Sequence, residues 1–153
     1  MATIYLVACS SQKQDARAAA QDLYTSPLFR KSRALAERDA DDWYILSAKF
    51  HALDPHTRLA PYDLTLRTMN ADQRRHWAYQ AFQALLRFNT LNPGDRVVLL
   101  AGKLYREHLV PLLEGYGLWV EEPLEHFGIG EQLQYLTMML TDHTQEGTDH
   151  AQI

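Results

Sequence analysis

The sequence predicts an α/β fold, a three-layer sandwich in which helices flank a mainly parallel sheet of four strands. Two observations predict it. Four short apolar runs alternate with four segments of helical periodicity, which is the pattern of parallel βαβ units. The chain has 153 residues and is 46% apolar, which suits one hydrophobic core. We expect residues 1–142 to form a single domain and residues 143–153 to form a polar tail.

The strands are predicted from short apolar runs, which are typical of strands buried on both faces. The expected strands are Ile4–Ala8, Trp43–Leu46, Val97–Ala101 and Leu118–Val120. The helices are expected to begin at Ser26, Asn70, Gly102 and Gly130. Pro27 suits the first turn of the first helix, and Pro111 is expected to interrupt the third because proline lacks a backbone donor.

The charge of the chain is divided along its length. All 15 Lys and Arg residues lie at or before Arg106, where the formal charge is +5, and the remainder of the chain carries −9. The first two-thirds can therefore offer a basic surface, although an ordinary solvated surface with an acidic tail explains the same division.

The single Cys9 excludes an internal disulfide, and no apolar run is long enough for a membrane span. We expect a cytoplasmic monomer that does not bind membranes.

A long connection follows the second expected strand, from Ser47 to Met69. Loops of this length are uncommon unless they form a site, and this one combines apolar anchors with charged residues. Asp54 and Asp63 are candidate catalytic carboxylates. Capping of their own loops explains both aspartates equally well.

Small or polar residues follow three of the expected strands. They are Cys9, Ser10 and Lys13 after the first strand, Ser47, Lys49, Phe50 and His51 after the second, and Gly102, Lys103, Tyr105 and Arg106 after the third. Because the carboxyl ends of parallel strands share one edge of a sheet, we expect these segments to converge on one cleft. The first and third segments offer backbone donors and cations suited to phosphate.

Other chemistry has weaker support in the sequence. Cys9 is either a thiolate nucleophile beside Lys13 or a buried structural thiol, and we favour the buried thiol. The seven histidines lack paired metal-ligand spacing, and no dinucleotide or Walker motif is present, so we expect neither metal nor cofactor. Glu131 follows a two-glycine turn, Gly128 to Gly130, that resembles a site of close ligand approach, and a helix start that needs a positive φ explains this turn equally well.

Six segments together resemble a bacterial family of small domains related to the YaaA peroxide-stress proteins and, more distantly, to the uracil-DNA glycosylase-like superfamily. They read CSSQK, LYTSPLFRKSRALAE, WYILSAKFHALDP, APYDLTL, AGKLYREHL and GIGEQLQYL, and they extend to about Leu136. Phe50 and His51 stand where that family usually has His-Gly. The resemblance implies a uracil-DNA glycosylase-like fold that acts on DNA in repair or phage defence.

The resemblance also implies roles for individual residues. In a base-excision reaction, Asp63 is our first choice for the carboxylate that stabilises the cationic sugar, and Asp54 is the second. The base or substrate would contact Ser47, Lys49, Phe50, His51, Tyr62 and Glu131. Flanking phosphates would contact Cys9, Ser10, Lys13, Gly102, Lys103, Tyr105 and Arg106.

Three functions remain open at this point. The first is a DNA glycosylase that flips out and excises a damaged or modified base, with hypermodified phage bases among its candidate substrates. The second is a non-catalytic DNA-binding stress protein. The third is a hydrolase or transferase of free nucleosides or nucleotides.

Overall fold

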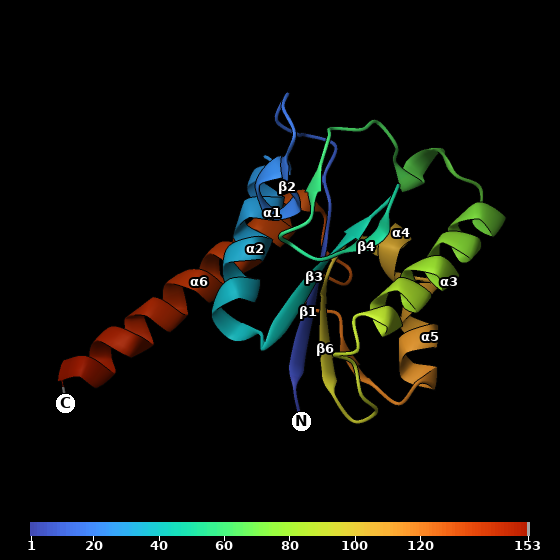
Figure 1. Ribbon diagram of the computed structural model, residues 1–153. Coiled ribbons are helices and arrows are strands. Elements are labelled where there is room, and N and C mark those ends of the chain that lie inside the picture. Colours follow the sequence, from blue (N-terminus) through green and yellow to red (C-terminus); the bar gives the residue numbers. More distant parts are fainter. Residues whose placement is uncertain (153) are drawn as a thin grey trace.

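The main sheet of the computed structural model has five strands, and helices cover both of its faces (Figure 1). The strand order is β4-β3-β1-β6-β7, with β1 at Thr3–Ala8, β3 at Asp42–Ser47, β4 at His51–Leu53, β6 at Arg96–Leu100 and β7 at Trp119–Glu121. A separate antiparallel pair joins β2 (Ala18–Ala19) to β5 (Arg58–Leu59). The structure describes residues 1–152, with side chains through Thr141.

The sheet is mixed, so the prediction of a mainly parallel four-stranded sheet is wrong. β1 pairs in parallel with β3 and with β6, and β6 pairs in parallel with β7. β4 pairs antiparallel with β3, opposing Ser47 to His51 and Ile45 to Leu53. The prediction missed β4 because it is only three residues long and lies inside the expected loop. The other four strands form where the apolar runs predicted them.

The helical segments are α1 (Ala20–Leu23), α2 (Pro27–Asp39), the 3-10 turn η1 (Leu66–Thr68), α3 (Ala71–Arg87), α4 (Lys103–Arg106), α5 (Leu109–Gly115) and α6 (Ile129–Gln152). Of these, α2, α3, α4 and α6 begin near the four predicted positions, whereas α1 and η1 were not predicted. The Ser26 side chain accepts a hydrogen bond from the Phe29 amide and thereby caps α2. Asn70 and Gln73 form a reciprocal capping box at the start of α3.

Two predicted details differ from the structure. The third helix is divided between α4 and α5 at Glu107 and His108, upstream of Pro111. Pro111 lies in the first turn of α5, where the missing backbone donor costs nothing. The predicted tail over residues 143–153 falls mostly on α6, whose side chains beyond Thr141 lie outside the described part of the chain.

The alternation of side chains along the strands divides the core between two faces. On β1, Ile4 and Leu6 join the cluster that packs against α3 and α5, while Tyr5 and Val7 join the cluster that packs against α1, α2 and α6. Both faces of the sheet are therefore buried, as a central parallel strand requires. Among the described residues, no helix is long and apolar enough to cross a membrane.

Candidate functional site

The carboxyl ends of three neighbouring strands meet at one edge of the sheet. Strand register places Ala8 beside Leu46, and Val7 beside Leu100, so the residues that follow β1, β3 and β6 emerge together. The chain passes from β1 to β3 on one side and later adds β6 on the other side of β1. This arrangement makes the gap between β1 and β6 a topological switch point, where ligands of open α/β sheets bind.

Eight residues gather at this edge, and we call them the carboxyl-edge cluster. They are Cys9, Lys13, Tyr24, Ser47, Lys49, Phe50, Tyr62 and Tyr105. They come from the ends of β1 and β3, the end of α1, α4 and the loop that follows β5. Seven of the eight were candidate site residues on sequence grounds, and the structure brings these seven together.

A chain of hydroxyl groups crosses the cluster. The Tyr62 hydroxyl lies 2.6 Å from the Tyr24 hydroxyl and 2.8 Å from Ser47 Oγ. Ser47 Oγ also accepts a hydrogen bond of 3.0 Å from the Phe50 amide. Ser47 is fully buried, so it positions the Tyr62 ring from below. This network ties the Tyr62 side chain to the end of β3 and to the end of α1.

Two ammonium groups lie over the aromatic rings of the cluster. Lys13 Nζ is 4.4 Å from the centroid of the Tyr62 ring, and Lys49 Nζ is 5.3 Å from the centroid of the Phe50 ring. The Phe50 and Tyr62 rings meet edge to face at 5.5 Å, and Phe50 is 38% exposed. The cluster therefore presents two cations beside an exposed aromatic face, a combination that binds phosphate and stacks on a base.

The phenols of the cluster stay protonated. Burial raises the pKa of Tyr62 and of Tyr105 well above the ordinary value of 10, and the nearby Cys9 raises both further. Burial likewise raises the pKa of Tyr24. At neutral pH, these groups therefore donate hydrogen bonds and do not serve as bases.

Cys9 and Tyr105 join the two strands at the switch point. Cys9 Sγ lies 3.2 Å from the Tyr105 hydroxyl, and the Cys9 amide donates to the carbonyl of Leu46. The Tyr105 ring also packs edge to face against Trp77 at 5.4 Å. Cys9 is half-buried and contacts the Tyr105 hydroxyl, so the structure places it in the framework of the cluster.

A reversal of the chain after β3 presents Lys49 and Phe50. His51 takes a φ of 69°, in the left-handed region that favours glycine, and this allows the chain to turn back along β3 as β4. Trp77 Nε1 donates a hydrogen bond of 2.9 Å to the Ser47 carbonyl from α3. The turn is therefore held by a helix on one side and by its own strand pairing on the other.

The structure separates the two candidate carboxylates. Asp63 follows Tyr62 directly, is exposed, and makes no hydrogen bond or ion pair with another described residue. Asp54 follows Leu53, which pairs with Ile45, so it lies back along β3 from the carboxyl edge. The Asp54 carboxylate accepts a hydrogen bond of 2.9 Å from the His56 amide and closes its own turn. Of the two aspartates, only Asp63 directly follows a residue of the cluster in the chain.

The predicted phosphate contacts are dispersed. Arg106 is 9% exposed, donates to the Ala101 carbonyl and pairs with Glu122 at 2.9 Å, so its charge is occupied within the fold. Lys103 is exposed and lines a different cavity of about 530 Å³ that Arg106 also borders. Glu131, which was predicted to contact the base or substrate, accepts a hydrogen bond from the Gly128 amide and caps the start of α6.

Two more candidates remain beside the cluster. The Ser10 hydroxyl donates to the Gln12 carbonyl and closes the turn after β1. Gly102 begins α4, and open space lies where a Cβ would project. Both residues line a small cavity of about 40 Å³ at the switch point, which is large enough for about one water molecule.

Sequence reasoning missed two residues that hold the cluster. Tyr24 was not singled out because its hydroxyl partner lies 38 residues away, although it stands two positions before the Ser26 cap. Trp77 is one of the buried residues of α3, and its spacing in the sequence indicates only a core role. It is buried, but its indole N–H also fixes the Ser47 carbonyl.

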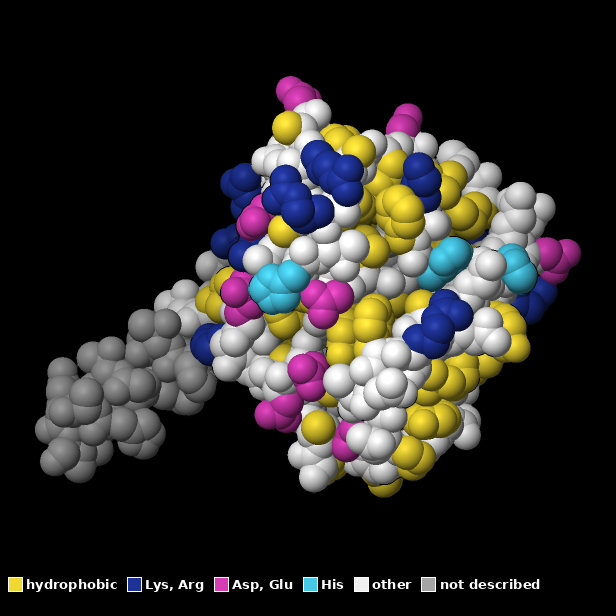
Figure 2. All heavy atoms as spheres, in the orientation of Figure 1, with side chains coloured by type: hydrophobic (Ala, Val, Ile, Leu, Met, Phe, Trp, Pro, Cys, Tyr) yellow, Lys and Arg dark blue, Asp and Glu magenta, His cyan; other side chains and the backbone are white. Residues whose placement is uncertain are grey.

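The surface around the site has a mixed character. Figure 2 shows Lys and Arg side chains beside hydrophobic side chains in the upper half of the face, and several acidic side chains lower down. Among the described residues, no group of three or more His, Cys, Asp or Glu side chains is arranged to hold a metal ion. The cluster at this edge consists of two lysines, four aromatic residues, one serine and one cysteine, and Asp63 follows it in the chain.

Comparisons with known proteins show the family. The model of a family of unknown function, DUF6884, matches residues 4–138. The chain belongs to the DUF6884 family. An uncharacterized protein of Bacillus subtilis, YfjM, is 33% identical over 125 residues, covering 76% of this chain and 77% of that protein. The matched residues include the whole carboxyl-edge cluster, so the cluster lies within the region that defines this DUF6884 member.

Proposed function

We propose that this DUF6884 protein is a DNA glycosylase that excises a damaged or modified base at the carboxyl-edge cluster. The observation that most directly supports this proposal is the placement of Lys13 over the Tyr62 ring and of Lys49 over the Phe50 ring, with Asp63 next to Tyr62 in the chain. Lysines beside an exposed phenylalanine ring and a half-buried tyrosine ring suit a nucleotide that has left the base stack. The proposal extends the uracil-DNA glycosylase-like fold that the sequence resemblance implies.

The proposed reaction is hydrolysis of the N-glycosidic bond. The bond from C1′ to the base nitrogen breaks, its electron pair leaves with the base, and the oxygen of water bonds to C1′. Asp63 stabilises the positive charge on the sugar and accepts the proton of the attacking water. The departing base takes a proton from solvent and Asp63 returns its proton to solvent, while Lys13 and Lys49 bind the flanking phosphates.

The test is the formation of abasic sites in DNA. Purified protein is incubated with oligonucleotides carrying uracil, alkylated, oxidised or hypermodified bases, and abasic sites are detected by alkaline cleavage. We expect Asp63→Asn to lower the single-turnover rate at least 100-fold. Asp54→Asn is the matched control, because Asp54 closes its own turn away from the cluster, and it should excise at the wild-type rate. Full activity of Asp63→Asn would refute this role.

DNA binding is tested separately from catalysis. Replacement of Lys13 and Lys49 by Met should weaken binding and reduce the slope of log K against log salt by about 1.4 to 1.8, the loss of two phosphate contacts. Lys31→Met on α2 is the control. An unchanged slope in the double variant would remove the cluster from the DNA-binding surface.

A non-catalytic role is the second candidate. It is favoured by the exposure of Asp63, which no described residue orients. Binding that depends on Lys13 and Lys49, without release of any base from the panel, would select this function.

A further inference from the structure

A second concave surface lies next to the carboxyl-edge cluster. This surface, which we call the α3 groove, has a volume of about 650 Å³ and lies between the Ala48–His51 turn, the Leu64–Met69 segment and the first turns of α3. Its size falls within the range of small-molecule and nucleotide sites. Neither the proposed excision step nor the core packing accounts for it.

The chemistry of the α3 groove suits nucleobases. Trp77, Leu64 and Met69 give it an apolar floor and wall. The side chains of His51, His76 and Gln80 add groups that both donate and accept hydrogen bonds. Burial lowers the pKa of His51, so its imidazole is neutral at pH 7 and offers one donor and one acceptor. The edges of a base therefore find hydrogen-bond partners here, beside an apolar wall.

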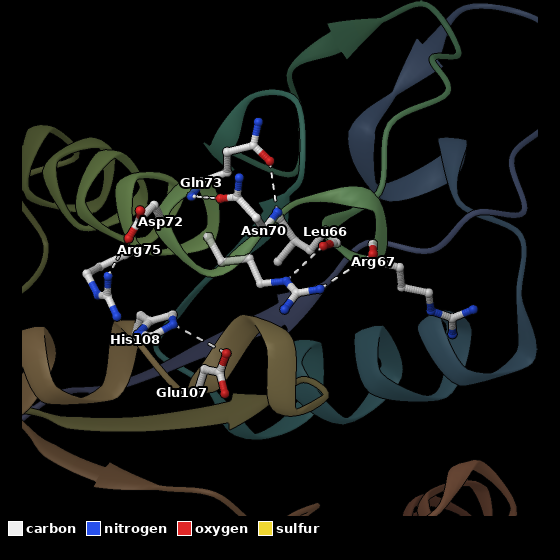
Figure 3. Close-up of polar contacts among 9 residues, drawn as sticks. Leu66, Arg67, Asn70, Asp72, Gln73, Arg75, Glu107 and His108 are labelled. Carbon is white, nitrogen blue, oxygen red and sulfur yellow. Dashed lines mark hydrogen bonds and ion pairs between the residues drawn. The ribbon is translucent and has the colours of Figure 1, made fainter.

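The charge of the groove favours a phosphate-linked ligand. Lys49 belongs both to the cluster and to the groove wall. Asp72 also lines the groove, but Arg75 neutralises it at 2.8 Å. Figure 3 shows this pair beside the Asn70–Gln73 capping box at the start of α3. A DNA strand that passes from the cluster into the groove would therefore bring a phosphate close to the Lys49 ammonium group.

We propose that the α3 groove binds the nucleotides that flank the target in single-stranded DNA. This inference rests on the proposed function, because it takes Lys49 as the link between the two surfaces. A base in the groove must present its Watson–Crick edge to His76 and Gln80, and in a duplex that edge is already paired. The protein therefore selects DNA in which the neighbours of the target are unpaired.

Equilibrium binding tests the proposal without any need for turnover. Fluorescence anisotropy is measured with a labelled 12-nucleotide oligothymidylate, with a duplex of the same length, and with a labelled thymidine mononucleotide. We expect the single strand to bind at least tenfold more tightly than the duplex. The variants His76→Ala and Gln80→Ala should each weaken single-strand binding about fivefold or more and leave the weak binding of the mononucleotide at the cluster unchanged.

Gln83→Ala is the matched control. Gln83 is an exposed amide on the same helix, bonded to Tyr79 and outside the groove, so its loss should not affect binding. Thermal melting shows whether each variant folds. Duplex binding equal to or tighter than single-strand binding would overturn the proposal, and so would groove variants that bind like Gln83→Ala.

Crosslinking provides a measurement that needs no variant. Oligothymidylate carrying 4-thiothymidine is irradiated with the wild-type protein, and mass spectrometry locates the adducts. Adducts in the segment 64–80 support the groove, and adducts confined to other segments overturn it.

If the groove binds single strands and no base is released, the excision step fails while this inference stands. If excision proceeds on duplex DNA without the groove residues, the inference fails alone.

Discussion

The Tyr62 hydroxyl lies 2.6 Å from the Tyr24 hydroxyl, and this contact ties the loop after β5 to the end of α1. Ser47 continues the contact from the end of β3 at 2.8 Å from Tyr62. Three segments distant in sequence are thus joined by neutral hydroxyl groups at the rim of the sheet. The arrangement predicts strong energetic coupling between the two tyrosines.

A double-mutant cycle measures this coupling. Tyr62→Phe should lower the free energy of unfolding by about 1 to 3 kcal/mol, because it leaves the buried hydroxyl groups of Tyr24 and Ser47 without their shared partner. Tyr24→Phe should cost about 1 kcal/mol. The double variant should cost less than both single losses together, since the first change already removes the contact. Additive losses in urea denaturation would show that the hydroxyls act independently.

The backbone of His51 makes a prediction that is independent of function. Its φ of 69° penalises any residue with a Cβ, by about 1 to 2 kcal/mol. His51→Gly should therefore be more stable than His51→Ala by about 1 kcal/mol, although glycine elsewhere is the less stabilising of the two. Urea denaturation of both variants gives the difference. A more stable alanine variant would mean that the turn relaxes to a negative φ.

The imidazole of His51 also makes stability depend on pH. Burial lowers its pKa below 6.5, so the unfolded chain binds a proton more readily than the folded chain. Its contribution to stability is therefore complete above about pH 6.5 and is lost as the pH falls through the folded pKa. His51→Asn retains a residue that tolerates the left-handed backbone and should flatten the pH dependence of unfolding in this range. An identical pH profile in this variant would exclude His51 as the source.

Substitution of Arg106 tests whether its guanidinium group stabilises the fold or binds phosphate. Arg106→Gln should lower the free energy of unfolding by about 3 kcal/mol, because Glu122 and the Ala101 carbonyl lose a largely buried partner. Lys103→Gln, three positions earlier on α4, is the control and should change stability by less than about 0.5 kcal/mol. Weakened DNA binding in an Arg106→Gln variant of normal stability would restore the phosphate role.

The sequence predicted the elements whose signals are local. The Ser26 and Asn70 caps lie within three residues of the amides or side chains that they engage, so a short pattern is enough to place α2 and α3. β4 was not predicted because its three residues can pair with β3 only after the chain reverses, and this reversal depends on the left-handed φ of His51. Sequence spacing does not indicate a backbone angle that a histidine rarely adopts.

The site was predictable to the extent that strand ends share an edge. Cys9, Ser47 and Tyr105 meet because parallel register aligns the strands that precede them. Arg106 was assigned to phosphate because the sequence shows its charge and not its burial beside Glu122. Partners far along the chain decide which polar residues remain available to a ligand.

Trp77 gives the two surfaces a common mechanical link. Its ring forms part of the groove floor, while its N–H holds the carbonyl of Ser47, whose hydroxyl holds Tyr62. A molecule that displaces the indole from below would therefore shift the tyrosine above the strand end. The groove and the cluster are thus joined by one continuous path of hydrogen bonds through Trp77, Ser47 and Tyr62.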